Sequence, residues 1–426
     1  MKISKMTKTI LAVLLISSLC GCTSLNGNNN TQPANTNSPA VVDDSSAANT
    51  VTDLSDLFTD RDLAQSADLT NATYYTVSNN TDITISSAGV YVLSGNAEQV
   101  TVIIEAGDED KVQLVLDGLN LTNTDAPCIY VKSADKVFVT TTSTQNTLKV
   151  TSTFSADGDT NTDAVIFAKD DLVLNGTGTL TIESTDNGIT SKDDLKITGG
   201  TYDITCENNA LEAHDSIAIA DGNFTIVSAD DGLHAEDDDD DTVGYIYIAD
   251  GSFNIKASDD AIHATTTLTI DGGEFTISCA EGLEATQVTV NGGTINISAS
   301  DDGINAAAKS SALAIFVRFT GGNTTINMGQ GDTDGVDSNG NLYISGGTIS
   351  VNGQSAFDFD GQVSFTGGTV YVNGQQVTSI SNQMMGGGMM PGGNPQGDNG
   401  FPGGNGEGMM PTQPGGGMGG HGGPHH

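Results

Sequence analysis

A phrase that returns about every 22 residues is the strongest constraint on how this chain can fold. Each copy has an alternating apolar stretch that ends in Gly-Gly or Asp-Gly, a second alternating stretch, and then acidic, small and apolar residues. Three examples are LKITGGTYDITCENNALEA, IAIADGNFTIVSADDGLHA and LTIDGGEFTISCAEGLEA. Such a period indicates stacked coils rather than one globular core, so a side chain fixed in the repeat forms a row along the surface.

Each unit predicts three short strands. Leu195 and Ile197 are the inward pair of one first strand, Tyr202 and Ile204 are the pair of the next strand, and Leu211 begins the third. A small residue precedes every third strand. We expect a tight corner there, where only a small side chain fits and where the backbone can need a positive φ. We therefore predict an all-β fold, a right-handed single-stranded parallel β-helix (a solenoid) with three strands per coil of about 22 residues.

Residues 1–22 resemble a bacterial lipoprotein signal peptide. Three lysines precede an apolar run that is too short for a committed membrane span, and the box Leu19-Cys20-Gly21-Cys22 follows. The resemblance implies that Cys22 becomes the lipidated N-terminus of an extracytoplasmic protein, anchored in the membrane at the cell surface. An ordinary secretory signal is the alternative.

Composition divides the rest of the chain. Residues 23–52 are rich in Asn, Thr and Ser and predict a disordered tether, and residues 382–426 are rich in Gly, Met and His and predict a disordered tail. Residues 53–381 hold the predicted β-helix. Within them, residues 53–68 predict a short helix that caps the open end of the solenoid.

The charge is strongly acidic. Asp and Glu number 54 against 14 Lys and Arg, for a formal net charge of −40. Such a surface repels nucleic acid and anionic lipid headgroups and favours hydrated cations. We expect no nucleic-acid partner, and we expect the protein to be a monomer.

Acidic side chains flank the corner before each third strand, coil after coil. Carboxylates one coil apart repel each other by about 3 kcal/mol at an effective dielectric near 20, and bound calcium, with its preference for hard oxygen ligands, relieves that repulsion. The predicted ligands in these rows are Asp230, Asp231, Asp259, Asp260, Glu281, Asp301, Asp302, Asp332, Asp334 and Asp337. The alternative is that these residues only satisfy corner backbone groups, as Asp and Asn do in turns.

A second calcium candidate is the loop with oxygen-bearing side chains at alternate positions, Asp157, Asp159, Asn161 and Asp163. It lacks the glycine of an EF-hand and is not one. Two histidines, His234 and His263, occupy the same slot in adjacent coils, about 5 Å apart. Beside carboxylates they are either transition-metal ligands or ordinary surface histidines.

Catalytic machinery is not evident. Bases are sparse, and no cluster of Arg and Lys meets an acidic row in the sequence, so we predict no catalytic residue. The chain has no Trp for gripping flat cellulose. Tyr247, Arg318 and Tyr343 lie on an outward row of the first strands and are the candidate carbohydrate-binding residues, together with outward rows of Thr, Ser and Asn.

The stretches TDRDLAQSAD, KVQLVLDGLNLTN, APCIYVKSADKVFVT and NGITSKDDLKITGG resemble a bacterial family of carbohydrate-binding domain proteins. The resemblance covers about residues 58–375. It implies a pectate-lyase-like β-helix that carries calcium and binds cellulose and acidic polysaccharide such as polygalacturonate, without demonstrated lyase activity. The family's calcium ligands do not transfer residue by residue, so the ligands above rest on spacing alone.

These observations lead to one expectation and two alternatives. We expect non-catalytic, calcium-dependent binding of polysaccharide at the cell surface, with Ca²⁺ as the cofactor. The first alternative is a polysaccharide (pectate) lyase. The second is a structural surface protein whose calcium only stiffens the coils.

Overall fold

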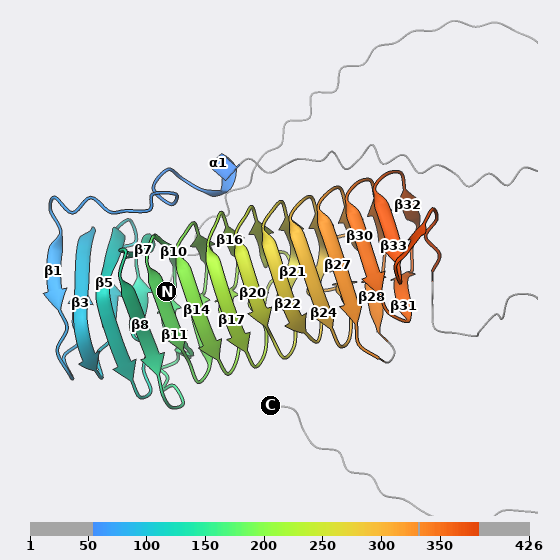
Figure 1. Cartoon of the computed structure of the whole chain (residues 1–426). Helices are drawn as coiled ribbons and strands as arrows, with labels where there is room; N and C mark the ends of the chain where they lie inside the picture. The colour runs from blue at the N-terminus through green and yellow to red at the C-terminus, as the bar shows by residue number, and fades with distance from the viewer. Residues whose placement is uncertain (1–53, 331–332, 383–426) are drawn as a thin grey trace, which may run out of the picture. The chain divides into compact units, whose positions relative to one another are not determined.

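The structure, a computed structural model, describes residues 54–330 and 333–382. They are nearly all β: one short helix, α1 (Leu54–Leu57), precedes strands that join into a single long, mostly parallel sheet. Each strand pairs with the equivalent strand of the next coil, and the strands lie side by side in chain order (Figure 1). This is the β-helix type of architecture that the repeat predicted; its handedness stays a prediction.

Strands occupy three positions in each coil, named here first, second and third after their order in the repeat. First-position strands are β1 (Thr73–Thr76), β7 (Lys136–Thr141), β10 (Asp171–Gly176), β13 (Asp194–Ile197), β16 (Ser216–Ile219), β19 (Tyr245–Ile248), β26 (Phe316–Phe319), β29 (Asn341–Ile344) and β32 (Val363–Phe365). Second-position strands are β8 (Gln145–Val150), β11 (Thr179–Glu183), β14 (Thr201–Cys206), β17 (Asn223–Ser228), β20 (Ser252–Lys256), β22 (Glu274–Cys279), β24 (Thr294–Ala299), β27 (Asn323–Met328), β30 (Thr348–Asn352) and β33 (Thr369–Val372).

Third-position strands are β2 (Ile83–Ile85), β4 (Val102–Glu105), β6 (Ile129–Ser133), β9 (Ala164–Ala168), β12 (Asn187–Ser191), β15 (Leu211–Ala213), β18 (Leu233–Ala235), β25 (Ile304–Ala306), β28 (Asp334–Ser338) and β31 (Ser355–Phe359). Four strands span two positions: β3 (Gly89–Glu98), β5 (Lys111–Asn123), β21 (Ile262–Ile270) and β23 (Leu283–Val290). The last strand, β34 (Gln375–Val377), is not part of the repeat and pairs antiparallel with β33.

The core is a column of stacked apolar side chains. The predicted inward pairs are buried, as in β13, where Leu195 and Ile197 are both 0% exposed. Aromatic rings from four consecutive second-position strands stack in the order Tyr202, Phe224, Phe253, Phe275, with centroids 5.2, 4.7 and 4.5 Å apart. Among the predicted inward pairs of the first strands, the pair in β32 is less buried than the others: Val363 is 36% exposed, near the last described coil.

The corner before each third-position strand is tight because two backbones approach closely. A Cβ added to Gly232 would lie 2.5 Å from the carbonyl oxygen of Ala261 and 2.8 Å from Ile255 Cγ2. Gly232 does not have a positive φ. Positive φ occurs instead at the Gly-Gly corner, as at Gly273 (φ 100°). The small residue before the third strand is therefore required by space rather than by backbone conformation.

The N-terminal segment does not cap an end of the coil stack. Residues 54–65 lie along the outer face of first-position strands: Lys196 Nζ of β13 donates to the carbonyl oxygen of Leu57 at 2.8 Å, and Gln65 Nε2 donates to that of Thr198 at 2.8 Å. The Arg61 guanidinium lies 4.3 Å above the Phe138 ring of β7. The predicted cap over residues 53–68 is thus wrong, because the polar groups of this segment find partners along the side of the coils.

Candidate functional site

The outer face of the second-position strands is an exposed polar surface. Exposed and buried side chains alternate along β17, β22 and β24, as the period of two requires. The exposed row carries hydroxyl and amide groups from successive coils, among them Thr225, Asn254, Thr276 and Asn296. The predicted outward rows of Thr and Asn are therefore confirmed here.

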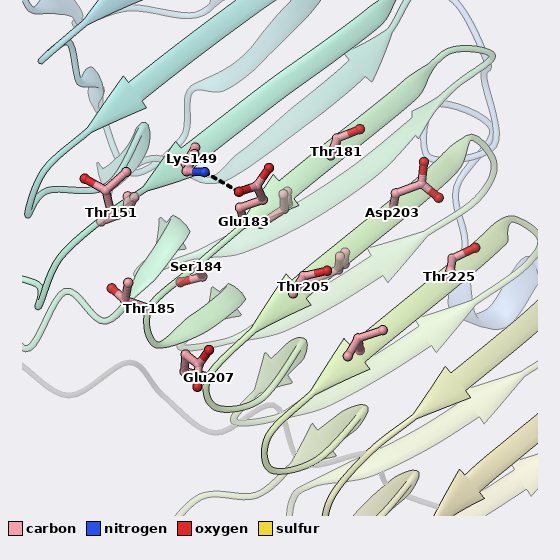
Figure 2. Close-up of a pocket in the computed structure, with 14 residues that line it drawn as sticks. Lys149, Thr151, Thr181, Glu183, Ser184, Thr185, Asp203, Thr205, Glu207 and Thr225 are labelled. Atoms are coloured by element: carbon pink, nitrogen blue, oxygen red, sulfur yellow. Dashed lines mark hydrogen bonds and ion pairs between the residues drawn. The ribbon is translucent and has the colours of Figure 1, made fainter.

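A groove of about 610 Å³ crosses this face over β8, β11, β14 and β17 (Figure 2). Its lining is mostly polar: Lys149, Thr151, Thr181, Glu183, Ser184, Thr185, Asp203, Thr205, Glu207 and Thr225, with a few apolar groups such as Val227. The ammonium of Lys149 is paired with the carboxylate of Glu183. The carboxylates of Asp203 and Glu207 add negative charge, so the groove offers hydroxyls and carboxylates to a ligand and no unpaired ammonium.

The acidic corner row forms a hydrogen-bonded ladder. Asn187 Oδ1 accepts the backbone N–H of Asn209 at 3.0 Å, and these partners are 22 residues apart. In the same way Asn209 Oδ1 accepts the N–H of Asp231 at 3.1 Å, and Asp231 Oδ1 accepts that of Asp260 at 2.8 Å. These side chains satisfy corner backbone groups, which is the alternative that the sequence left open.

Two coils of the repeat are lengthened by insertions after their third-position strands, residues 236–244 and 307–314. Both insertions contact the outward row of the third-position strands. His234 and His263 occupy neighbouring coils of this row, and their rings stack with centroids 4.8 Å apart. The first insertion brings Glu236 Oε2 to 3.5 Å from the Nε2 atoms of both histidines. The second brings Lys309 Nζ to 2.9 Å from Glu284 Oε2.

Carboxylates hold the other nitrogen of each ring. His234 Nδ1 lies 2.7 Å from Asp231 Oδ2, and His263 Nδ1 lies 2.8 Å from Asp260 Oδ2. Burial disfavours the charged ring of His234, but its hydrogen bonds to Asp231 and Glu236 outweigh burial and raise the pKa to about 9. Burial also disfavours the charged ring of His263, but its hydrogen bonds to Asp260 and Glu284 outweigh burial and raise the pKa to about 10. This cluster lines a cavity of about 300 Å³.

Among the predicted calcium ligands, the structure gathers one compact set. Carboxylate oxygens of Asp230, Asp231 and Asp259 lie within 4.8 Å of one another. Burial raises the pKa of Asp230 and of Asp259, and neighbouring carboxylates raise both further. Excess negative charge at this corner is the condition under which a divalent cation stabilises a fold. Within this set Asp231 also holds His234 Nδ1 and accepts the backbone N–H of Asp260, so Asp230 and Asp259 are its less engaged members. Asp260 lies beside the set and holds His263.

Further along the row the predicted ligands have mixed environments. Glu281 accepts from Asn305 Nδ2 at 2.9 Å, and Asp302 Oδ1 accepts the backbone N–H of Asp334 at 2.9 Å. Burial raises the pKa of Asp302 to about 7 and that of Asp337 to about 6. Asp301 is exposed on the same corner. Asp332 lies outside the described residues.

The loop at 157–163 does not bring its side chains to one point. Asp157 Oδ2 pairs with Lys132 Nζ at 2.7 Å, whereas Asp163 is buried and accepts from Asn161 Nδ2 at 2.7 Å. Asp157, Asp159 and Asp163 do not form one of the carboxylate clusters found among the described residues. These acids therefore do not converge as the ligands of a calcium loop must.

The three predicted carbohydrate-binding residues, Tyr247, Arg318 and Tyr343, do not share one environment. Tyr247 is only 4% exposed, and its hydroxyl donates to Asp271 Oδ2 at 2.7 Å. Tyr247 does lie on the outward side of β19, between the inward-facing Ile246 and Ile248, but its ring is covered and its hydroxyl is used, so it is not available to a sugar. Arg318 and Tyr343 do lie together, with the guanidinium 5.1 Å from the Tyr343 ring centroid.

The repeat pattern alone did not predict the roles of Glu236 and Lys309 or the pairing of Lys149 with Glu183. Glu236 and Lys309 lie in insertions, and contacts of an insertion do not follow the period of the coils. The sequence signal available was the position of both insertions, directly after third-position strands. The pairing of Lys149 with Glu183 required the register between β8 and β11, which aligns these two residues.

The predictions for the two termini fall outside the described residues. These include the predicted lipidation of Cys22, the tether at 23–52 and nearly all of the tail at 382–426. Among residues 54–330 and 333–382, no helix has the length and apolarity to cross a membrane.

The fold and site define a repetitive β protein with polar outer faces. A family model described as "Carbohydrate-binding domain-containing protein" matches residues 79–335. The chain therefore belongs to this family of carbohydrate-binding domain-containing proteins.

One relative, a carbohydrate-binding domain-containing protein of Acetivibrio thermocellus, is 34% identical over 127 residues, which are 29% of this chain. The match spans 44% of that relative's length. A solved structure, the polysaccharide lyase-like protein from C. thermocellum as a gadolinium derivative, is 29% identical with a TM-score of 0.46. It covers 53% of this chain and 93% of its own.

Proposed function

We propose that this protein binds polysaccharide at the cell surface without cleaving it, in a calcium-dependent way. The observation that carries the proposal is the groove over β8 to β17, in which hydroxyls and carboxylates of successive coils face outward (Figure 2). Such groups hydrogen-bond to the hydroxyls of a sugar chain, and cellulose or a polygalacturonate-like polymer is the expected ligand class. The coils are taken to be right-handed, as parallel crossovers are.

The calcium dependence is proposed because the groove is negatively charged. The groove carries Asp203 and Glu207, so an acidic polymer is repelled unless a cation lies between. Val227, at the end of the groove, is three residues before Asp230, and Asp259 follows one coil later at the same corner. The carboxylates of Asp230 and Asp259 are the main donors that would hold Ca²⁺, which accepts six to eight oxygen ligands in flexible geometry. Asp231 lies in the same set and would add a lone pair that its bonds to His234 and to the Asp260 N–H leave unused.

The absence of catalysis is also part of the proposal. A lyase needs a neutral base near the acidic sugar at working pH. Burial disfavours the charged form of Lys309, but Glu284 outweighs burial and raises the lysine pKa, so Lys309 stays charged. A lyase remains the competing outcome, and ultraviolet-absorbing unsaturated product from pectins would establish it.

Affinity electrophoresis in gels that contain polygalacturonate or a soluble cellulose derivative tests the proposal. We expect retardation of the protein in calcium, and a weaker effect for the Asp230→Asn, Asp259→Asn double variant in the polygalacturonate gel. Asp250→Asn, an exposed acid at the opposite corner, is the control for loss of charge. Equal migration with and without either polymer would contradict binding.

Localisation follows from the leader. We propose that the mature chain begins at a lipidated Cys22 and is held at the outer side of a membrane, with the β-helix as a monomer above it. Mass spectrometry of the N-terminal peptide tests this: a diacylated cysteine is expected, and cleavage elsewhere with an unmodified terminus would contradict it.

A further inference from the structure

We propose that His234, His263 and Glu236 form a binding site for a transition-metal ion of the zinc class. The site differs from the proposed calcium ligands in its chemistry, because two imidazole nitrogens and one carboxylate meet there. Both Nε2 atoms lie 3.5 Å from the same oxygen, Glu236 Oε2. A tetrahedral ion with ligands about 2.1 Å away separates adjacent ligand atoms by about 3.4 Å, close to the two separations from Glu236.

The carboxylates behind the two rings have the arrangement that metal-binding histidines require. Asp231 and Asp260 engage the Nδ1 atoms at 2.7 and 2.8 Å. Both rings are protonated near neutral pH, so a bound ion displaces the proton from each Nε2. The carboxylate on Nδ1 then fixes the tautomer and directs Nε2 toward the metal. The ladder also fixes Asp231, since its second oxygen accepts the backbone N–H of Asp260 at 2.8 Å.

An independent observation indicates that a ligand is expected here. His263 is 7% exposed, and its Nε2 is buried without a hydrogen-bond partner. Its one ion-pair contact, Glu236 Oε2 at 3.5 Å, is too long and poorly aligned for a hydrogen bond, and coordination by an ion between the two would satisfy the nitrogen. Both histidines also line the neighbouring cavity of about 300 Å³.

The placement of Glu236 gives the site a consequence for the fold. This residue lies on the insertion that follows β18, whereas the two histidines lie on the coil itself. The rings are now stacked 4.8 Å apart, so coordination requires both to turn toward Glu236. A bound ion would thereby tie the insertion to the coil face.

Cobalt(II) titration of the full chain tests the proposal, because its visible absorption distinguishes tetrahedral nitrogen coordination from an octahedral oxygen site. The chain should carry alanine at His421, His425 and His426 so that the tail contributes no imidazole, and the titration should be run in millimolar calcium. We expect one equivalent of Co²⁺ with intense absorption, displaced by Zn²⁺ and not by calcium.

Variants make the test specific. His263→Ala and Glu236→Gln should abolish the intense absorption or weaken affinity at least tenfold, and Asp260→Asn should weaken it by about 10- to 100-fold. Glu236 lies on an insertion and is partly exposed, so its variant keeps the test valid if a histidine variant fails to fold. His214→Ala, on the preceding coil, is the matched control and should bind as the parent does. Equal binding by all variants, or displacement by calcium, would overturn the proposal.

Discussion

The backbone N–H of Ser311 donates a hydrogen bond of 2.8 Å to Asp241 Oδ2, although the two residues are 70 positions apart in the chain. Each lies in one of the two coil insertions, so the insertions meet across the intervening coils. Both insertions also contact the third-position row, one through Glu236 and the other through Lys309. The repeat therefore supplies a regular face, and the insertions make one part of it different from the rest.

Loss of the Asp241 carboxylate should free the insertions from each other without unfolding the coils. In Asp241→Ala we expect faster hydrogen exchange at the Ser311 amide and at residues 236–244, because the exposed bond that holds them is gone. The thermal midpoint should hardly change. Asp240→Ala is the control, since Asp240 bonds only to Thr242 nearby in its own loop. Unchanged exchange at Ser311 would show that the contact does not persist in solution.

The corner ladder should contribute measurably to stability. Asn209→Ala removes the acceptor of the Asp231 backbone N–H and leaves that buried group unsatisfied. We expect the free energy of unfolding to fall by about 1–3 kcal/mol. Asn223→Ala, at an exposed position of β17, should change it by less than about 0.5 kcal/mol. Denaturant unfolding of both variants measures the difference, and equal effects would contradict a role for the ladder.

Because the backbones approach closely at the corner, a larger side chain there should lower the stability of the fold. Gly232→Ala introduces a methyl group 2.5 Å from the Ala261 carbonyl oxygen, and the coil must shift to admit it. We expect a loss of about 1–3 kcal/mol from overpacking. The control is Gly107→Ala, where the nearest neighbour is the side chain of Asp110. Two variants of equal stability would indicate that the corner yields freely.

Stability should also depend on the protonation of Asp193. Burial, aided by the charges of Asp171, Asp215 and other acids, raises its pKa to about 7. An unfolded aspartate titrates near 3.9, so between about pH 4 and 7 the folded chain binds more protons than the unfolded chain. The contribution of this group to stability therefore decreases as pH rises through that window.

The measurement is a comparison of parent and Asp193→Asn proteins in chelator. At pH 8 the asparagine variant should be the more stable protein, because it removes a carboxylate that is charged and crowded there. At pH 4, the lower end of that window, the two should differ little. A variant less stable than the parent at pH 8 would reverse the sign and contradict the argument.

Much of the fold could be predicted because the repeat is regular. Side chains at Leu195 and Ile197 alternate with a period of two, and their equivalents recur in every coil, so burial follows from the pattern. The position of residues 54–65 could not be predicted, because it depends on pairings such as that of Lys196 with Leu57, which no local pattern encodes. Tyr247 was misjudged for a related reason: alternation says which side of a strand a ring lies on, not what covers it.

The candidate site could also be predicted only where it follows the repeat. Asp230, Asp231 and Asp259 share a corner by periodicity, and the structure brings them together. The sequence could not decide how many of the acidic oxygens are already used, and Asp231 and Asp302 turn out to accept backbone N–H groups of the next coil. Nor could it place Glu236 over the histidines, because the conformation of an insertion is set by its own contacts.

The central claim is that calcium held at the acidic corner joins this base-poor surface to an acidic polysaccharide. Isothermal titration of the full chain with polygalacturonate, first in calcium, then in chelator and then after calcium is restored, tests it most directly. The account predicts binding in calcium, its loss in chelator and its recovery on restoration. Binding of equal affinity in chelator would contradict the calcium bridge, and no binding under any of the three conditions would contradict polygalacturonate as the ligand.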